Sequence, residues 1–254
     1  MNVLAIHLYL TIRHINLGFN YFGNFYRIIV LSDSNIIKRM GALAASAVIS
    51  STGLGAPNLI NGNNGNMKIL AINGSSRKQG TTGDMIDVVL SELSGQGHIV
   101  DKIDLAGHSI NPCKACFACA GKRNCVFFDD IFRDVYERMT EADVIIMGSP
   151  TYSADVSSTL KAVIERASVV SDTNPGMFSH KIGAGIEVGR RAGTMNVLDT
   201  INRFFLNIEM FIAGSTYWNI AYGRLPGEAL KDAEGVETMR NLGKNISWLL
   251  SRTA

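Results

Sequence analysis

The chain has 254 residues, of which 46% are hydrophobic and 18% are charged. This length allows one or two domains, and this balance excludes a disordered acidic or basic chain. Lysine and arginine number 24 against 22 acidic residues, which gives a net charge of +2. The sequence holds no dense basic run with interleaved aromatic residues, so its composition argues against nucleic acid as a partner.

The first 66 residues differ in character from the rest of the chain. Segment 32–56 joins Lys38-Arg39 to a short apolar run and then to small residues, which is the order of a secretory leader. The apolar run is too short to form a stable membrane span. Residues 61–66 read Asn-Gly-Asn-Asn-Gly-Asn and predict a flexible linker. Two interpretations stay open: a degenerate export leader, which would direct the protein to the cell envelope, or an artefactual extension, which would leave it in the cytoplasm.

From Met67 onward, short apolar runs alternate with segments of helical period. Strands are predicted over 69–72, 98–105, 142–148, 181–188 and near 210–213, and helices over 82–93, 129–139, 157–167, 194–206 and 234–250. Repeated strand–helix units predict a parallel sheet with right-handed crossovers and helices on both faces. Ligands of such α/β sheets bind beyond the carboxyl ends of the strands, so the loops at those ends form the candidate site.

The loop after the first strand, residues 73–82, reads Asn-Gly-Ser-Ser-Arg-Lys-Gln-Gly-Thr-Thr. Its glycines let the backbone approach a ligand, while hydroxyls, amides at the helix start and Arg77 can bind anionic oxygens. The loop therefore predicts a phosphate site, with an ordinary helix-capping turn as the alternative. It lacks the spacing of the nucleotide-triphosphate loop and of the dinucleotide fingerprint, which disfavours ATP and a classical NAD fold.

Two further loops are predicted at the same edge. In residues 149–153, Ser-Pro-Thr-Tyr-Ser, Pro150 sets the backbone direction and Tyr152 offers an aromatic face to a planar ring. The alternative is a turn whose tyrosine only covers a helix. Residues 189–194, Gly-Arg-Arg-Ala-Gly-Thr, form a glycine-rich strand-to-helix junction that we expect to complete one wall of the cleft.

The four cysteines of the chain form a C-x2-C-x2-C-x5-C array of Cys113, Cys116, Cys119 and Cys125. Two-residue spacers let a curling backbone aim three thiolates at neighbouring irons, and the spacer that contains Gly121 allows a fourth to return. The array predicts one [4Fe-4S] cluster. A zinc site and thiols that are redox-active or form disulfides stay open as alternatives.

From Met67 to the C-terminus the chain resembles the flavodoxin-like NAD(P)H-dependent FMN reductases, and among them the iron–sulfur flavoproteins. The resemblance lies in Gly74-Ser-Ser-Arg, in Gly80-Thr-Thr and in the cysteine spacing. The family usually has Gly-Ser-Pro-Arg and Gly-Asn-Thr, so Ser76 and Thr81 depart from it while keeping small polar groups. The resemblance implies a flavodoxin-like three-layer sandwich with a five-stranded parallel sheet of order 2-1-3-4-5. It makes residues 67–254 an FMN-binding domain with a cysteine-rich insert at 111–127.

The resemblance also implies site residues and a function. The FMN phosphate would be held by Ser75, Arg77, Thr81 and Thr82, and the flavin ring would be lined by Pro150, Thr151, Tyr152 and Ser153. Beside them we expect Gly189, Arg190 and Gly193 to complete the cleft, on the glycine-rich pattern of their loop and not on the resemblance. FMN accepts two electrons and a cluster carries one at a time, so the expected function is electron transfer from NAD(P)H or ferredoxin to an acceptor. A homodimer or homotetramer is expected. The alternatives are a cluster-free NAD(P)H-dependent FMN or quinone reductase and a non-enzymatic flavin- or zinc-binding module.

Overall fold

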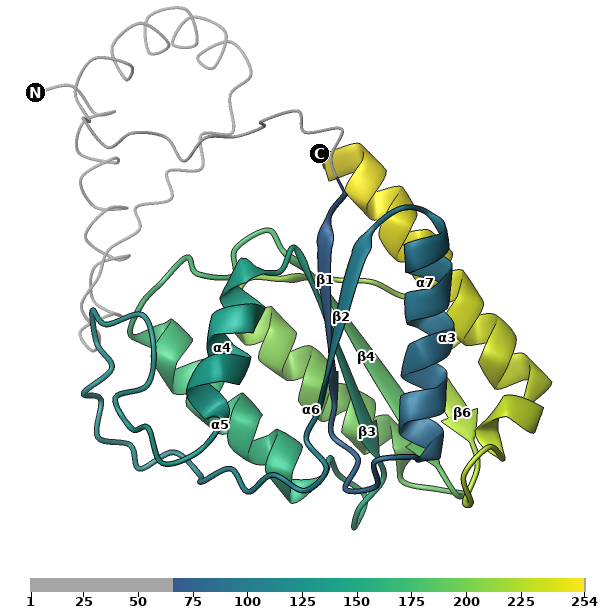
Figure 1. The fold of residues 1–254 in the computed structure, drawn as a ribbon, viewed down its shortest axis with the longest axis horizontal. Helices are drawn as coiled ribbons and strands as arrows, with labels where there is room; N and C mark the ends of the chain where they lie inside the picture. The colour runs from purple at the N-terminus through teal and green to yellow at the C-terminus, as the bar shows by residue number, and fades with distance from the viewer. Residues whose placement is uncertain (1–65, 254) are drawn as a thin grey trace, which may run out of the picture. The chain divides into compact units, whose positions relative to one another are not determined.

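The computed structural model describes residues 66–253. The leader-like segment 32–56 and residues 61–65 of the predicted linker lie outside the described residues. Strands and helices alternate along the described chain (Figure 1). In chain order the elements are β1 (Lys68–Asn73), α3 (Thr81–Gly95), β2 (Ile99–Asp104), α4 (Phe132–Glu141), β3 (Val144–Pro150), α5 (Ser158–Asp172), β4 (Ile182–Gly189), α6 (Thr194–Asn207), β5 (Phe211–Ile212), β6 (Ile220–Tyr222), the 3-10 helix η1 (Ala229–Lys231) and α7 (Ala233–Thr253).

The sheet is parallel, and its strand order β2-β1-β3-β4-β5 confirms the predicted one. The outer position beside β4 is shared by two short strands. β5 pairs with the start of β4, and β6 pairs with its carboxyl end, where Glu187 lies opposite Ile220. The sequence prediction missed β6 because three residues are too few to display a strand period.

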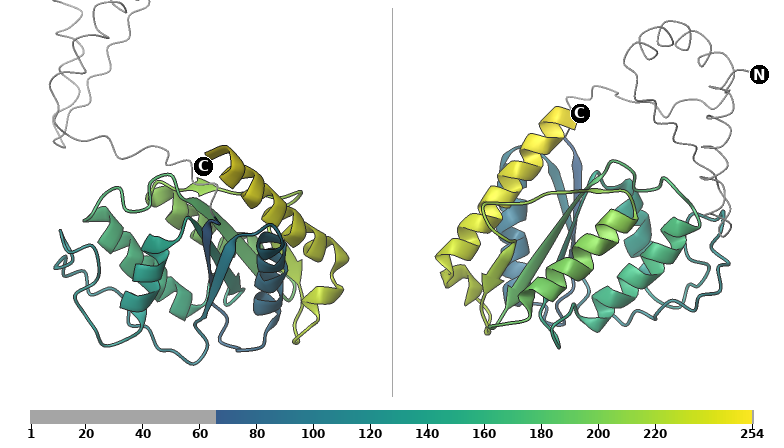
Figure 2. Two further views of the ribbon diagram at one scale, coloured as in Figure 1. Left: turned by 45° about the horizontal axis from the view of Figure 1, so that its top comes forward. Right: turned by 180° about the vertical axis from the view of Figure 1, so that it is seen from behind.

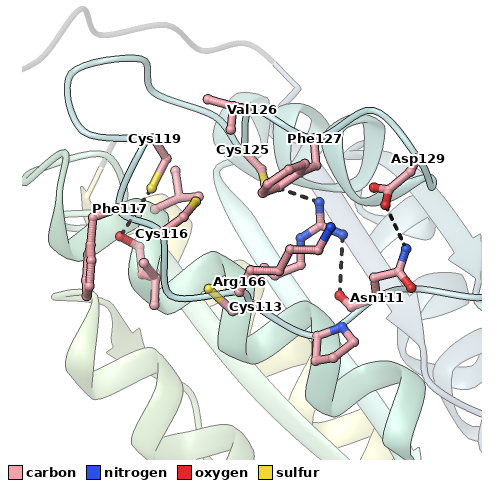
Figure 3. A pocket seen from close by; sticks show the side chains of 14 residues that line it. Asn111, Cys113, Cys116, Phe117, Cys119, Cys125, Val126, Phe127, Asp129 and Arg166 are labelled. Atoms are coloured by element: carbon pink, nitrogen blue, oxygen red, sulfur yellow. Dashed lines mark hydrogen bonds between the residues drawn. The ribbon is translucent and has the colours of Figure 1, made fainter.

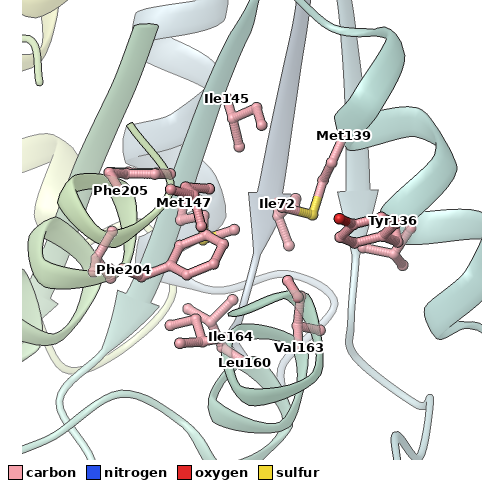
Figure 4. Close-up of a cluster of buried hydrophobic side chains, with 14 of the residues drawn as sticks. Ile72, Tyr136, Met139, Ile145, Met147, Leu160, Val163, Ile164, Phe204 and Phe205 are labelled. Carbon is pink, nitrogen blue, oxygen red and sulfur yellow. The ribbon is translucent and has the colours of Figure 1, made fainter. Parts of the chain in front are cut away.

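The sheet is buried on both faces, so its central strands supply side chains to two hydrophobic cores. Helices α4, α5 and α6 cover one face, and α3 and α7 cover the other (Figures 1 and 2). Along β3, Ile145 and Met147 point to the first core, and Val144 and Ile146 point to the second. In the first core, shown in Figure 4, Ile145 and Met147 pack with residues of the three helices.

Helices α4 and α5 are two of the elements whose boundaries differ from the prediction. α4 begins at Phe132 rather than at residue 129, because the Asp130 carboxylate accepts the amide N–H groups of Phe132 and Asn111 at 2.9 and 2.8 Å. α5 continues beyond Ala167 to Asp172 because its apolar stripe continues through Val170. Among the described residues, no helix combines the length and the apolar character needed to cross a membrane.

Candidate functional site

The loop between β1 and α3 is shaped by its own polar groups. The buried Asn73 side chain accepts the Ser75 amide at 3.1 Å and donates to Asp104 Oδ1 at 2.7 Å. Ser75 Oγ in turn accepts the amide of Arg77 at 3.1 Å. At Gly74 the backbone donates to the carbonyl oxygen of Gly148 at 2.7 Å, so the loop lies directly against the end of β3.

The N-terminus of α3 has no side-chain cap within the described chain, because its N-cap residue is Gly80. A Cβ at Gly80 would lie 3.2 Å from Ser75 Oγ, so a larger residue would crowd the loop. Thr81 and Thr82 are buried in the first helical turn. Uncapped amides at a helix start, next to hydroxyl groups, suit a phosphate group.

Three of the residues expected at the phosphate, Ser75, Thr81 and Thr82, are therefore close in the fold and buried. The fourth, Arg77, is exposed, and its Nη1 donates to the carbonyl oxygen of Arg224 at 2.9 Å. Arg224 follows β6, so a further loop reaches this edge of the sheet. Sequence reasoning missed that loop because it follows the strand that could not be recognised.

The loop after β3 contacts the loop after β1. Ser76 Oγ and Tyr152 Oη lie 2.8 Å apart, within hydrogen-bonding distance. Tyr152 and Asp155 form a backbone-paired turn whose central residues, Ser153 and Ala154, have φ of 50° and 61°. This turn ends β3 and places Tyr152 beside the predicted phosphate loop.

The glycine-rich loop after β4 packs on the β3 loop. Gly193 has φ of 87°, and a Cβ there would lie 3.1 Å from Ala154 Cα. A Cβ at Gly189 would lie 2.6 Å from Thr194 Cγ2. Both glycines are needed for close approach, while Arg190 is exposed. The structure thus brings the three predicted loops together at the carboxyl edge of the sheet.

Beneath this loop junction lies a carboxylic acid that sequence reasoning missed. Glu187 in β4 has no exposed surface, and one of its oxygens accepts a hydrogen bond from Thr151 Oγ1. Its other oxygen, Oε2, has no partner among the described residues. Burial raises the pKa of Glu187 to about 7, against the smaller lowering effect of the Thr151 hydrogen bond. The signal that the sequence offered for it was an acidic residue within an otherwise apolar strand.

The cysteines lie in the loop before α4 and form a second candidate site. All four line one cavity of about 420 Å³, counting the part open to solvent, together with side chains from the second half of α5 (Figure 3). Cys119 is buried, Cys113 and Cys125 are half-buried, and Cys116 is exposed. The loop is fixed to the end of α5 by Asn174, which donates to the carbonyl oxygen of Cys119 at 3.1 Å.

The four sulfurs share this cavity without converging on one point. Within residues 66–253, no three histidine, cysteine, aspartate or glutamate side chains are close enough to hold a metal ion. The donor set nevertheless suits an iron–sulfur cluster, since thiolates are the usual ligands of such clusters and four are available here. The residues fit the group by chemistry and by sharing a cavity.

Sequence reasoning also missed a buried ion pair beside the cysteines. Arg166 of α5 is paired with Asp130, and its Nη2 lies 3.2 Å from Cys125 Sγ. The available signal was a charged residue on the apolar stripe of α5, three positions after Val163.

Known proteins share both the sequence pattern and the fold. The sequence profile of the NADPH-dependent FMN reductases matches residues 67–224. An iron–sulfur flavoprotein of Methanocaldococcus jannaschii is 32% identical over 188 residues, covering 71% of this chain and 96% of the relative. An iron–sulfur flavoprotein of Methanosarcina thermophila is 30% identical over 183 residues, covering 71% of this chain and 93% of the relative.

Solved structures agree on the fold. RosB, crystallised with 8-demethyl-8-formylriboflavin-5'-phosphate bound, superposes with a TM-score of 0.60 at 17% identity, covering 73% of this chain and 79% of that one. At that identity the likeness concerns the fold alone. The profile match, the relatives and the parallel sheet together identify the chain as a member of the NADPH-dependent FMN reductase family, close to the iron–sulfur flavoproteins, and as an FMN-binding flavin-dependent oxidoreductase.

Proposed function

We propose that this oxidoreductase passes electrons between a reduced donor, NAD(P)H or ferredoxin, and an acceptor, using FMN and a [4Fe-4S] cluster. Bound FMN would supply two-electron chemistry and the cluster would supply one-electron chemistry. Together they would let carriers of two electrons exchange electrons with carriers of one electron. The observation that carries the proposal is that all four cysteines of the chain line one cavity. The names of the relatives from Methanocaldococcus jannaschii and Methanosarcina thermophila point the same way.

In this proposal the three loops at the carboxyl edge hold FMN. The phosphate would be bound by Ser75, Arg77, Thr81 and Thr82 with the amides of the first turn of α3. The ring would be lined by Pro150, Thr151, Tyr152 and Ser153, and the wall would be completed by Gly189, Arg190 and Gly193. The uncapped helix start and the 2.8 Å contact between Ser76 and Tyr152 support this assignment.

The cluster would be held by Cys113, Cys116, Cys119 and Cys125. Each sulfur would have to be a thiolate, and the irregular loop would have to close around the inorganic core. Helix α5 connects the two proposed cofactor sites, because it begins at Ser158 after the β3 loop and lines the cysteine cavity at Arg166. At 1.5 Å of rise per residue, these two positions are about 12 Å apart along the helix axis.

A homodimer or homotetramer belongs to the proposal, with the cluster of one subunit close to the flavin of another. Such an arrangement would shorten the path of an electron across the interface. Its test is the mass of the anaerobically purified protein in solution, and a monomer of the full chain would contradict it.

The decisive experiment is anaerobic purification of the full chain followed by iron, sulfide and flavin analysis. We expect about four irons and four sulfides per chain, together with FMN. Cys116→Ala should remove iron and leave FMN bound, because the exposed Cys116 lies on a loop separate from the flavin loops. Lys114→Ala, at an exposed residue between two of the cysteines, is the matched control and should keep both cofactors. Joint loss of FMN and iron in Cys116→Ala would contradict two separate sites.

One observation favours a second candidate, a cluster-free NAD(P)H-dependent FMN or quinone reductase. Among residues 66–253, no three potential ligands converge on a metal position. That enzyme would show flavin absorption that NADH or NADPH bleaches under anaerobic conditions, with neither iron nor sulfide in the wild-type chain. Failure of every donor to bleach the flavin would instead indicate a carrier of flavin without turnover.

A further inference from the structure

The buried pair of Arg166 and Asp130 is the only described ion pair with both side chains almost wholly enclosed. Their side chains are 3% and 2% exposed, whereas every other ion pair among residues 66–253 lies at the surface. Burying two charges costs several kcal/mol per ion, and the attraction repays this cost only where further hydrogen bonds satisfy both groups. The groups that hydrogen-bond to Asp130 and Arg166 therefore indicate what role the buried pair has.

Asp130 uses its oxygens to close the base of the cysteine loop. It accepts the amide of Asn111, two residues before the first cysteine, at 2.8 Å. It also accepts the amide of Phe132, at the start of α4, at 2.9 Å. Burial alone would raise the pKa of Asp130, but these two hydrogen bonds and Arg166 outweigh it and hold the pKa below its usual value. The carboxylate is thus ionised and fixed.

Arg166 is held in place from several sides by groups other than the cysteine. Nη1 donates to Asp130 and, at 3.4 Å, to the carbonyl oxygen of Asn111. The guanidinium lies 4.1 Å from the centroid of the Phe132 ring. These contacts leave Nη2 directed at Cys125 Sγ, 3.2 Å away, as Figure 3 shows.

Two of the other sulfurs have neutral hydrogen-bond partners. Cys113 Sγ accepts the amide of Ala115 at 3.4 Å, and Cys119 Sγ lies 3.4 Å from Thr173 Oγ1. Within the described range, Cys125 is the cysteine whose sulfur receives a hydrogen bond from a cationic side chain. Charge-assisted hydrogen bonds are roughly twice as strong as neutral ones, so the guanidinium distinguishes this sulfur from the others.

We propose that Arg166 is a positioning residue of the cysteine site, which orients Cys125 and raises the reduction potential of a cluster bound there. This inference rests on the proposed function. Reduction adds negative charge to a cluster and its sulfurs, and an N–H donor or a cation beside a sulfur stabilises that charge. Asp130 partly cancels the guanidinium charge, so the two members of the pair should shift the potential in opposite directions.

The test uses the full chain, purified anaerobically and reconstituted with ferrous iron and sulfide. Iron and sulfide are counted, and the midpoint potential of the cluster is measured by a redox titration followed by electron paramagnetic resonance. Arg166→Met should bind iron, but its cluster should be harder to reduce. We expect the midpoint potential to fall by about 59 mV, which corresponds to about a tenfold change in the equilibrium constant of a one-electron reduction. Arg166→Lys keeps a cationic donor and should lie between Arg166→Met and wild type.

Arg133→Met is the matched control. Arg133 also contacts Cys125, but it donates to the backbone carbonyl oxygen and not to the sulfur, so the potential should stay at the wild-type value. Asp130→Asn leaves the guanidinium uncompensated and should raise the potential. The double variant Arg166→Met with Asp130→Asn buries no lone charge, so it tests the loss of the sulfur hydrogen bond where Arg166→Met alone fails to fold.

A purely structural role for the pair makes a different prediction. It would lower iron content in Arg166→Met and Asp130→Asn alike and would not move their potentials in opposite directions. Equal potentials in Arg166→Met and Arg133→Met would overturn this inference alone. A wild-type chain that binds no iron would overturn the proposed function and this inference with it.

Discussion

Replacement of Glu187 by glutamine tests whether an uncharged acid is buried beneath the three loops at the carboxyl edge of the sheet. The side chain has no exposed surface, and burial raises the pKa from 4.5 to about 7. At about 1.4 kcal/mol per pKa unit, this rise corresponds to roughly 3 kcal/mol in the free energy of unfolding. Because the pKa is higher in the folded state, the folded protein keeps a proton that the unfolded chain releases. The contribution of this proton to the free energy of unfolding is fully present below about pH 4.5 and is lost as the pH rises through about 7.

The assay is denaturant unfolding of wild type and Glu187→Gln at about pH 5 and about pH 8, with both proteins free of flavin because bound ligand raises apparent stability. Glutamine cannot ionise and resembles the uncharged acid. The free energies of unfolding of Glu187→Gln and wild type should therefore agree within about 1 kcal/mol at the lower pH. At the higher pH the variant should be more stable than wild type, by up to roughly 3 kcal/mol.

Glu165→Gln provides the control, since Glu165 is exposed on α5 and its replacement should change stability equally at both pH values. If the stabilities of wild type and Glu187→Gln changed in parallel with pH, Glu187 would not be buried as an uncharged acid. Burial at the end of β4 would then not raise the pKa of Glu187.

Three other substitutions probe the packing and the loop contacts. Gly183→Ala would place a Cβ 2.6 Å from Phe205 Cγ, so thermal unfolding should show a loss of about 1–3 kcal/mol, and an unchanged melting temperature would contradict this contact. Tyr152→Phe removes the 2.8 Å contact with Ser76, so FMN affinity measured by fluorescence should fall by up to about tenfold while stability changes by less than about 0.5 kcal/mol. Equal affinity would argue against a flavin at this loop. Asp130→Ala leaves a guanidinium buried without its partner and should cost about 3–5 kcal/mol in denaturant unfolding, and a cost below about 1 kcal/mol would contradict the enclosed pair.

Local patterns in the sequence were enough to predict a parallel sheet and the loops at its carboxyl edge, whereas the strand order was predicted from the resemblance to the flavodoxin-like FMN reductases. The apolar run that forms β3 is buried on both faces, and the period of the following segment identifies α5, so each unit could be recognised from neighbouring residues. The cysteine array was equally local. The short outer strand β6 was missed because three residues carry no period, and its position depends on pairing with β4.

The contacts that build the site join residues far apart in the chain, and local patterns cannot predict them. Ser76 and Tyr152 are 76 positions apart, and Arg166 lies 41 positions after Cys125. Glu187 and Arg166 were visible as charges within apolar segments, but a sequence does not tell whether such a charge is neutralised, paired or solvated. Their states depend on which groups the folded chain encloses beside them, because the cost of burying a charge is set by its partners and by the water that they exclude.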